Sequence, residues 1–223
     1  MTVSSIPVIA IDGPTASGKG TVAQRVAERL GFHYLDSGSL YRLVALAAIK
    51  QGQDLADAEA VTKIATNMDV AFRNGRTLLD GRDVGDEIRT EAASQNASRV
   101  AALPSVRTAL LKLQRDFRAA PGLVADGRDM GSVVFSDAVL KVYLTASAET
   151  RAERRTKQLK EKGMSAIMND VVKELRARDE RDMNRPIAPL KHYSDAYLID
   201  TTGISAEVAV QKILSLAQKS LGS

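Results

Sequence analysis

A glycine-rich turn that follows a short apolar run constrains this chain more than any other feature. The run is Val8 to Ile11, and the turn reads Gly13-Pro14-Thr15-Ala16-Ser17-Gly18-Lys19. Glycines permit backbone angles at which successive N–H groups point at a phosphate, and a helix that begins near Gly18 adds the positive end of its dipole. The pattern predicts a strand, a phosphate-binding loop and a helix in that order, with Lys19 as a mobile positive charge.

The loop departs from its usual form at one position. A Ser or Thr usually follows the lysine and contacts magnesium, but here Gly20 follows it and the hydroxyl comes one residue later, at Thr21. The sequence therefore leaves the direct magnesium ligands open. The residues expected to hold the phosphates of a nucleotide are Gly13, Pro14, Thr15, Ala16, Ser17, Gly18, Lys19, Gly20 and Thr21.

Composition narrows the class of protein. The chain has 223 residues and 44% hydrophobic content, which favours one domain with small insertions over two independent domains. The absence of cysteine excludes disulfides, thiolate metal sites and a thiol nucleophile, and only two histidines argue against a histidine-built metal site. The net charge is +4, but only 4% of the residues are aromatic and tryptophan is absent. Few side chains are therefore present on which nucleic-acid bases could stack. We expect the positive charge to serve phosphorylated substrates, with no nucleic-acid partner.

The sequence shows no pattern typical of a membrane protein. No apolar stretch approaches the roughly 20 residues of a membrane-spanning helix. The first ten residues lack the basic start and apolar core of a signal peptide. We expect a cytoplasmic monomer without a membrane partner.

Strand-like and helix-like segments alternate along most of the chain, and Gly31 is expected to end the first helix. This alternation predicts an α/β fold, in which a five-stranded parallel sheet carries helices on both faces. Ligands of such sheets bind beyond the carboxyl ends of the strands. The five expected strands are residues 8–12, 32–36, 123–126, 139–144 and 198–201.

Local signals also predict where three helices begin or end. One helix is expected over 40–51, Ser147 is expected to cap a helix that runs toward Lys162, and Ser205 is expected to cap the last helix. The residues of the last helix expected to face the core are Val208, Ile213 and Leu216.

One stretch interrupts the alternation. Residues 69–88 carry alternating apolar side chains and two turn signals, Asn74-Gly75 and Asp80-Gly81, which predict a small antiparallel meander. Helical stretches flank it at both ends. We therefore expect an insertion over 57–102 that acts as a substrate lobe within one domain spanning 1–223.

The end of the second expected strand carries candidate substrate contacts. Ser37 and Arg42 follow that strand closely, at the edge of the sheet where the phosphate loop is also expected. A second anion can bind there. For Arg42, a solvated helix charge is the alternative.

The tetrapeptide Asp-Gly-Arg-Asp occurs twice. The first copy, 80–83, falls in the meander as a hairpin turn whose charges are expected to be solvated. The second copy, 126–129, lies at the carboxyl end of a strand. There Arg128 can meet a phosphate, and Asp126 or Asp129 can accept a hydrogen bond from a ligand.

Arginines are frequent near the end of the chain. Arg151, Arg154 and Arg155 lie on a polar helix with a thin apolar face, which suits a mobile flap over a nucleotide or, alternatively, a solvated helix. A second group lies further on.

Arg178, Asp182 and Arg185 fall at i, i+4 and i+7, which places them on one helix face before Pro186 ends the helix. Two arginines with a carboxylate between them can bind phosphate and sugar hydroxyls together. An intrahelical salt bridge is the alternative.

Taken together, these residues resemble the bacterial cytidylate kinases, which belong to the nucleoside monophosphate kinases among the P-loop proteins. The Gly-Lys-Gly-Thr form of the loop is seen in such kinases, and the resemblance covers essentially the whole chain, including the meander. The motifs that carry it are Gly13 to Thr21, Asp36-Ser37-Gly38 with Tyr41-Arg42, 125–131, Arg178-Asp179, Arg181-Asp182, Asn184-Arg185 and Ala188-Pro189-Leu190.

The resemblance implies a P-loop kinase fold with a helical lid over about 150–185. It also implies an ATP-dependent reaction with Mg²⁺, in which the γ-phosphoryl group passes to the 5′-phosphate of CMP or dCMP. Lys19, Arg128 and Arg185 would act in catalysis. The implied substrate contacts are Arg42, Arg128, Arg185 and Ser37 for the acceptor phosphate, Arg178 and Asp182 for the ribose, and Ser98, Arg107 and Asp129 for the cytosine.

Chemistry makes the role of Asp129 reasonable. Cytosine offers an amino donor where uracil offers a carbonyl acceptor, so an ionised carboxylate favours one base and repels the other. Rival functions are a kinase for UMP or a sugar, a GTP-binding switch and a nucleic-acid-binding module. The switch would need an Asn-Lys-x-Asp tetrapeptide, which the chain lacks, and little beyond the net charge favours the module.

Overall fold

The computed structural model of the chain describes residues 6–73, 76–161, 163 and 165–222. The chain divides into two compact units, one formed by Met1–Asp36 with Arg115–Ser223 and the other by Ser37–Gln114. The expected insertion, 57–102, lies within the second unit.

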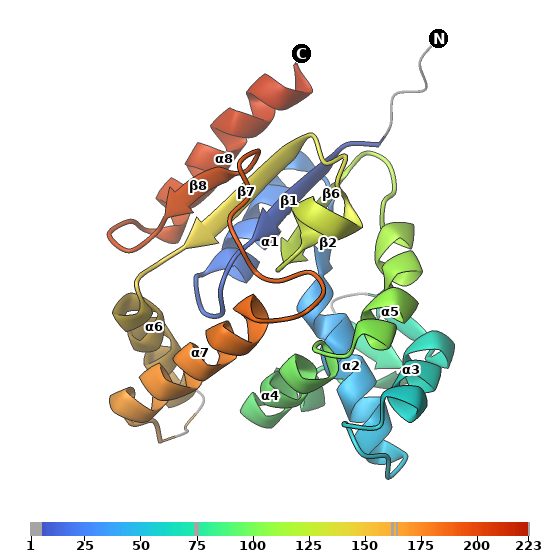
Figure 1. The fold of residues 1–223 in the computed structure, drawn as a ribbon. Helices are drawn as coiled ribbons and strands as arrows, with labels where there is room; N and C mark the ends of the chain where they lie inside the picture. The colour runs from blue at the N-terminus through green and yellow to red at the C-terminus, as the bar shows by residue number, and fades with distance from the viewer. Residues whose placement is uncertain (1–5, 74–75, 162, 164, 223) are drawn as a thin grey trace. The chain divides into compact units, whose positions relative to one another are not determined.

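A five-stranded sheet forms the centre of the first unit (Figure 1). The strand order is β2-β6-β1-β7-β8, and every neighbouring pair is parallel, as the alternating pattern predicted. The boundaries differ from the expected ones by one residue at most. The strands are β1 (Val8–Asp12), β2 (His33–Asp36), β6 (Leu123–Gly127), β7 (Leu140–Thr145) and β8 (Tyr197–Asp200).

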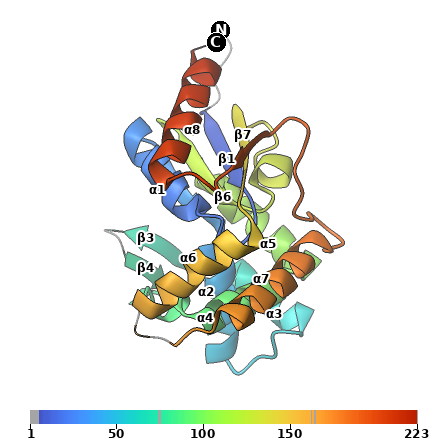
Figure 2. The ribbon, with the colours of Figure 1, turned by 90° about the vertical axis from the view of Figure 1, so that its left-hand side faces the viewer.

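Helices lie on both faces of this sheet. Figure 2 shows α1 (Lys19–Leu30) and α8 (Ala206–Leu221) on one face, and the short π-helix η2 (Met130–Val134) on the other. Because β1 lies between β6 and β7, its five residues are all buried. Gly31 ends α1 in the left-handed conformation, with φ of 65°, which confirms the predicted end of the first helix.

The last helix follows its predicted cap but not its predicted inward face. The Oγ of Ser205 accepts from the backbone N–H of Val208 at 3.3 Å, so the cap is confirmed. Val208 itself is 44% exposed, whereas Ile213 is fully buried and packs in the core with Ala209 and Val210. The expectation for Val208 was wrong because residues five apart lie about 140° apart around a helix and cannot share one narrow face.

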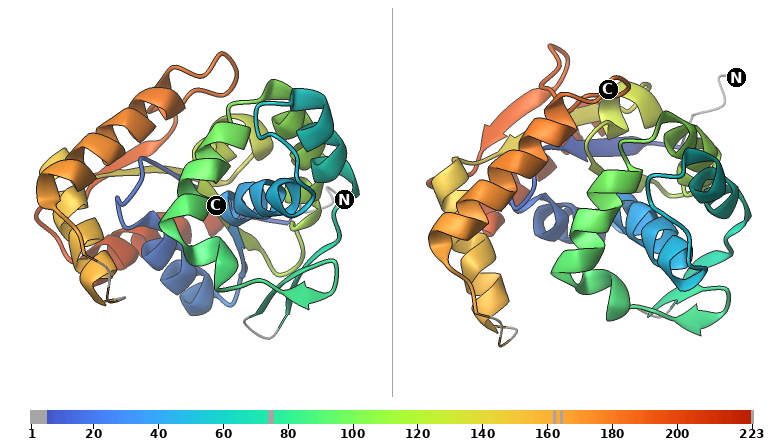
Figure 3. Two further views of the ribbon diagram at one scale, coloured as in Figure 1. Left: turned by 90° about the horizontal axis from the view of Figure 1, so that it is seen from below. Right: turned by 60° about the horizontal axis from the view of Figure 1, so that its bottom comes forward.

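Two helices of the first unit run side by side (Figure 3), α6 (Ala148–Glu161) and α7 (Met168–Met183). Their contact is a small apolar cluster, and the Oγ of Ser147 caps α6 by accepting from the N–H of Thr150 at 3.2 Å, as predicted. The cluster consists of Ala152, Leu159, Val171 and Leu175.

The second unit holds the predicted meander as a three-stranded antiparallel sheet in the order β3-β4-β5. Asp80 and Gly81 both have positive φ, 49° and 76°, and form the turn between β4 and β5. The other predicted turn, Asn74-Gly75, lies outside the described residues. The strands are β3 (Val70–Arg73), β4 (Arg76–Leu79) and β5 (Arg82–Asp83).

Helices precede and follow this small sheet along the chain, and α2 packs against α3 and α4. The helix α2 begins directly after β2, at Ser37, three residues earlier than the expected start at residue 40. The reason is that Leu40 and Leu43 are fully buried and the same helical face continues back to the buried Ser37 and Ser39. The elements are α2 (Ser37–Lys50), α3 (Ala58–Asn67), the 3₁₀ turn η1 (Glu87–Arg89), α4 (Glu91–Val100) and α5 (Pro104–Asp116).

Candidate active site

The phosphate loop lies between β1 and α1. Glycine is required there both because a side chain would clash with the sheet and because the backbone adopts a positive φ. A Cβ at Gly13 would lie 2.0 Å from the carbonyl oxygen of Leu144 in β7, so no other residue fits there. Gly18 has φ of 90° and directly precedes α1. The loop therefore passes close to the sheet and opens into a helix N-terminus, as the sequence predicted.

Lys19 is buried at the first position of α1. Its Nζ donates to the carbonyl oxygen of Pro14 at 3.1 Å and lies 4.0 Å from Oδ1 of Asp126 at the end of β6. Burial lowers the pKa of Lys19 to about 8, with the nearby charge of Arg128 acting in the same direction and Asp126 opposing both. The lysine charge is thus costly in the free protein, and an added anion would stabilise it.

Asp126 is a second buried charge beside the loop. Its Oδ2 accepts from the hydroxyl of Tyr34 in β2 at 3.3 Å, and a Cβ on Gly20 would lie 3.2 Å from the same oxygen. Burial raises the pKa of Asp126 to about 6, against the charge of Lys19, while Asp36 raises it further. The position that usually carries the loop hydroxyl is therefore a glycine here, and a side chain at that position would begin close to the Asp126 carboxylate.

A cavity of about 750 Å³ opens next to the loop. Its walls combine the polar loop with apolar groups at the start of α8, a mixture that suits the sugar and base of a nucleotide whose phosphates reach the loop. The lining comes from loop residues 16–21, from Val22 and Arg25 of α1, from Arg154, Lys157, Gln158 and Glu161 of α6, and from 201 and 204–206.

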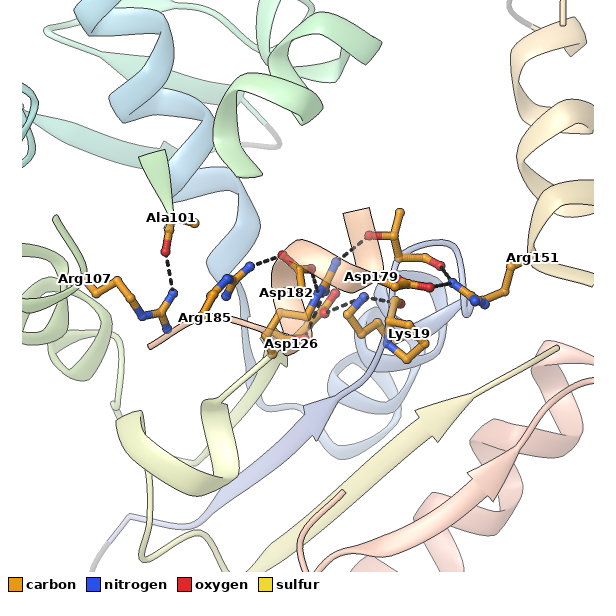
Figure 4. Close-up of polar contacts among 12 residues, drawn as sticks. Lys19, Ala101, Arg107, Asp126, Arg151, Asp179, Asp182 and Arg185 are labelled. Atoms are coloured by element: carbon orange, nitrogen blue, oxygen red, sulfur yellow. Dashed lines mark hydrogen bonds and ion pairs between the residues drawn. The ribbon is translucent and has the colours of Figure 1, made fainter. Parts of the chain in front are cut away.

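Arg128, Asp182 and Arg185 form a connected cluster. Nε of Arg128 donates to Oδ2 of Asp182 at 2.8 Å, and Nη2 of Arg128 donates to the hydroxyl of Thr15 in the phosphate loop at 2.7 Å. Arg185 donates to the other oxygen of Asp182 (Figure 4). Burial would raise the pKa of Asp182, but the charges of Arg128, Arg185 and Arg178 outweigh it and hold the pKa below its usual value.

The expected helical position of Arg185 was wrong. The helix α7 ends at Met183, with Asn184 as its C-cap, so Arg185 lies in the segment that follows. The physical reason is Pro186, since the residue before a proline is disfavoured in the helical conformation. The sequence pattern nevertheless identified Arg185 and Asp182 as neighbours, and both are buried.

Two of the three α6 arginines named in the sequence analysis contact the phosphate loop. Arg151 is only 6% exposed, donating to Oδ2 of Asp179 at 2.5 Å and to the loop carbonyl of Thr15 at 3.1 Å (Figure 4). Arg154 donates to the loop carbonyl of Ser17 at 3.2 Å. The solvated-helix alternative is therefore wrong for these two arginines, because the backbone carbonyl oxygens of the loop accept hydrogen bonds from them.

Asp129 follows β6 and is 3% exposed, at the N-cap position of η2. Asp12, the last residue of β1, accepts from the backbone N–H groups of Met130 and Gly131. Sequence reasoning did not single out Asp12. The signal for it was an acidic residue at the end of an otherwise apolar buried strand, which needs polar partners.

The remaining expected site residues lie in the second unit. Ser37 is buried at the start of α2, and Arg42 donates to the hydroxyl of Ser39 at 2.8 Å. Ser98 in α4 is 4% exposed, and its Oγ has no hydrogen-bond partner among the residues that the structure describes. Arg107 in α5 is also buried.

Arg107 has two contacts within the second unit. It donates to the carbonyl oxygen of Ala101 at 3.3 Å, and its guanidinium lies 5.5 Å from the centre of the Tyr41 ring. Ser and Arg side chains on helices are usually exposed, so the burial of both Ser98 and Arg107 is unusual. By contrast, the first Asp-Gly-Arg-Asp copy, 80–83, is exposed, as expected.

The expected site residues thus fall into two sets, one in each unit. The set in the first unit is Lys19, Arg128, Asp129, Arg178, Asp182 and Arg185 with the phosphate loop, and the set in the second is Ser37, Arg42, Ser98 and Arg107.

Within the described part of the chain, no helix is long and apolar enough to cross a membrane.

Comparisons with known proteins agree with these observations. A family model described as cytidylate kinase matches residues 9–219. The cytidylate kinase of Nitrosomonas europaea is 55% identical over 216 residues, 97% of each chain, and that of Burkholderia cenocepacia is 57% identical over 208 residues, 93% of this chain and 91% of the relative.

A similar solved structure is a gluconokinase from Sinorhizobium meliloti. It is 14% identical, with a TM-score of 0.51, and the match covers 97% of this chain and 95% of that one. At this level of identity, the likeness shows the fold alone.

Proposed function

This chain belongs to the cytidylate kinase family and is an ATP-dependent nucleoside monophosphate kinase, and we propose here which of its residues carry the reaction. The enzyme transfers the γ-phosphoryl group of ATP to the 5′-phosphate of CMP or dCMP, giving ADP and CDP or dCDP. The observation that carries this function is the buried Lys19 in a loop that opens into α1, within a chain that matches the family model over 9–219.

ATP binds in the first unit. Residues Gly13 to Thr21 hold its phosphates through backbone N–H groups and Lys19, and the cavity of about 750 Å³ takes the sugar and base. Two observations support this placement. Lys19 is a buried cation that an anion would stabilise, and the lining of the cavity includes the loop itself.

The donor set beside the loop fits Mg²⁺. Magnesium is usually held by one or two carboxylates together with substrate phosphates and water. Asp126 supplies such a carboxylate, and the nearby charge of Asp36 makes a cation there favourable. Within the described ranges, no group of three or more His, Cys, Asp or Glu side chains is placed so that it could hold a metal ion by itself. When bound, Mg²⁺ would neutralise charge on the donor phosphates.

The next group of residues is proposed to hold the acceptor. Arg42, Arg128 and Arg185 bind its phosphate, with Ser37 nearby. Asp182 and Arg178 bind its ribose. The support is that Asp182 already joins Arg128 and Arg185 in the first unit, so that the cations are pre-positioned by one carboxylate.

The cytosine is read by Ser98, Arg107 and Asp129. The support is that all three are buried polar side chains, and the Oγ of Ser98 has no hydrogen-bond partner in the part of the chain that the structure describes. A buried polar group without a hydrogen-bond partner destabilises the folded protein. Binding of a ligand that supplies such a partner is therefore favoured.

Catalysis needs no general base, because the attacking phosphate oxygen is already ionised. The protein holds the two nucleotides in line and surrounds the migrating group with positive charge from Lys19, Arg128 and Arg185. The lid arginines Arg151 and Arg154 hold the loop backbone through its carbonyls. Their role in the reaction is to fix the loop that binds the phosphates.

An acceptor panel tests this function. ADP formation from ATP and Mg²⁺ is measured with CMP, dCMP, UMP, AMP and shikimate, each against a blank without acceptor. Turnover confined mainly to CMP and dCMP is the expected result. Preference for another acceptor would leave the phosphate loop assignment standing and remove Ser98, Arg107 and Asp129 from base recognition.

We further propose that the enzyme is a monomer that works in the cytoplasm, where ATP and CMP are made and used. Light scattering on the eluting peak of a size-exclusion column tests the first point. A mass near the 24.0 kDa of one chain is expected, and twice that mass would contradict it.

A further inference from the structure

Thr201 is a buried polar residue in the wall of the cavity beside the phosphate loop. It directly follows β8, the last strand of the sheet, and is 3% exposed. Threonine is found mostly at protein surfaces, and a buried hydroxyl is costly unless it is hydrogen-bonded. The partners of this hydroxyl therefore show what Thr201 holds in place.

The hydroxyl of Thr201 lies among polar atoms from three other segments. Its Oγ1 accepts from Nη1 of Arg154 at 3.0 Å. It also lies within donating distance of two carbonyl oxygens, that of Thr145 at 2.9 Å and that of Ser17 at 3.2 Å. A hydroxyl has one proton and two lone pairs, so it donates to one carbonyl at a time while it accepts from the arginine. Thr201 thus connects the end of β7, the phosphate loop and α6.

Arg154 reaches the same place from α6. Besides the Thr201 hydroxyl, its Nη1 contacts the carbonyl oxygen of Ser17 at 3.2 Å, and its Nη2 donates to the carbonyl oxygen of Thr201 at 2.6 Å. Two of these three acceptors belong to Thr201, and the third belongs to the phosphate loop. An arginine side chain has many rotamers, so contacts on both of its terminal nitrogens restrict it strongly. The guanidinium is therefore held by Thr201 on one side and touches the loop on the other.

The contact with Ser17 bears directly on the binding of phosphate. A peptide group is planar, so an arginine that fixes the carbonyl of Ser17 also fixes the N–H of Gly18, which lies in the same plane. That N–H is one of the loop groups proposed to bind the phosphates of ATP. Ser17, Gly18, Arg154 and Thr201 all line the cavity.

We propose that Thr201 is a positioning residue of the donor site, which holds the guanidinium of Arg154 against the phosphate loop. The fixed peptide group then presents the N–H of Gly18 to the phosphates of ATP. The inference rests on the proposed binding of ATP in the first unit. It makes the shape of the loop depend on a hydroxyl that lies 184 residues from Ser17 in sequence.

A pair of substitutions isolates the hydroxyl, since Thr201→Ser keeps it, Thr201→Ala removes it and both lack the methyl group. With saturating CMP, we expect the KM for ATP to rise about tenfold in Thr201→Ala, the loss typical of one hydrogen bond to a charged group. In Thr201→Ser it should stay within about twofold of the unmodified value. The KM for CMP should change less than about twofold in both variants, because the contact acts on the donor side.

A double substitution tests whether the hydroxyl acts through the arginine. Arg154→Met should also raise the KM for ATP. Thr201→Ala added to it should raise the KM by less than the product of the two single effects, because both remove the same contact. Single effects that multiply in full would show that Thr201 acts independently of Arg154 and would overturn the inference.

Thr202→Ala is the matched control. Thr202 is the next residue along the chain and is exposed. Its hydroxyl donates to Oδ1 of Asp200 at 2.6 Å and accepts from the N–H of Ser147 at 2.9 Å, so it also joins the end of β8 to the start of α6. The KM for ATP of this variant should equal that of the unmodified enzyme, and a rise as large as that of Thr201→Ala would overturn the inference.

Urea unfolding first establishes that each variant is folded, and calorimetric titration with ATP and Mg²⁺, without acceptor, gives the Kd for ATP. If Thr201→Ala does not fold, Thr201→Val, which also lacks the hydroxyl, takes its place. An unchanged Kd in the folded variant, or equal rises in the KM for ATP and for CMP, would overturn the inference and leave the proposed function intact. If the unmodified protein bound no ATP, the proposed function would fail and the inference would fall with it.

Discussion

At the scale of single residues, Lys19 is a buried cation that the proposed function places against the phosphates of ATP. Its Nζ lies 3.1 Å from the Pro14 carbonyl oxygen, and burial lowers its pKa to about 8, so burial destabilises the ammonium form. A cation that is poorly solvated in the free enzyme is better able to stabilise developing charge in the transition state.

We therefore expect Lys19→Ala to lose at least about tenfold in kcat, since removal of one such charged donor commonly costs more than that. Steady-state ADP formation with saturating CMP measures it. Lys50→Ala is the control, because Lys50 is an exposed lysine paired with Glu87 on the surface of the second unit. Unchanged turnover in Lys19→Ala would contradict the phosphate-loop assignment.

Asp182 should make the stability of the fold depend on pH. It is 1% exposed and lies between two guanidinium groups, which hold its pKa below the usual value in spite of burial. A depressed pKa in the folded state means that Asp182 stabilises the fold above about pH 4, the unfolded value, and that this stabilisation is lost as the pH falls through the folded pKa.

Asp182→Asn should lower the free energy of unfolding by about 3 kcal/mol at neutral pH, because it leaves two buried arginines without their carboxylate. The difference from the unmodified protein should stay constant down to about pH 4 and shrink below it. Urea unfolding of both proteins across this range is the measurement. A difference that grew on acidification would show that the folded pKa of Asp182 is raised instead.

At the scale of elements, the pairing of α6 with α7 depends on a buried and an exposed ion pair. Arg151 and Asp179 are 8% and 10% exposed in their side chains, and Arg151 also holds the loop carbonyl of Thr15. Arg176 and Glu149 join the same two helices with side chains 65% and 68% exposed. The two pairs allow the effect of burial to be measured on one helix contact.

Arg151→Met should destabilise the protein by about 3 kcal/mol, because it strands the buried carboxylate of Asp179. Arg176→Met, the matched control, should cost between about 0 and 1 kcal/mol, as exposed pairs do. Chemical denaturation of both variants gives the comparison. Equal losses would mean that α6 and α7 are held together by their apolar cluster and not by Arg151.

At the scale of the whole molecule, ligand binding should appear as stability. A ligand that binds only the folded state stabilises it by about 2.7 kcal/mol at a hundred times its Kd. We expect ATP with Mg²⁺ to raise the midpoint of thermal unfolding. Adenosine lacks the phosphates that the loop is proposed to bind, so it should raise the midpoint far less. Equal shifts would place the binding energy outside the loop.

The residues that the sequence identified most clearly are those with a local cause. The turn from Gly13 to Lys19 requires glycine for its backbone, and the structure shows the reason at Gly13, where any Cβ would meet the carbonyl of Leu144. The strands, the caps at Ser147 and Ser205 and the Asp80-Gly81 turn are likewise set by residues within a few positions of one another. The parallel sheet followed from these local elements and their alternation.

What only the tertiary structure decided are the contacts between distant residues. No local pattern says that Asp12 caps η2, that Arg151 is buried against the loop or that Ser98 and Arg107 are enclosed. The helical spacing of Arg185 even indicated a helix that Pro186 prevents. Short-range sequence signals act through backbone conformation and periodicity, whereas the partners and burial of a polar side chain depend on which distant segments pack around it.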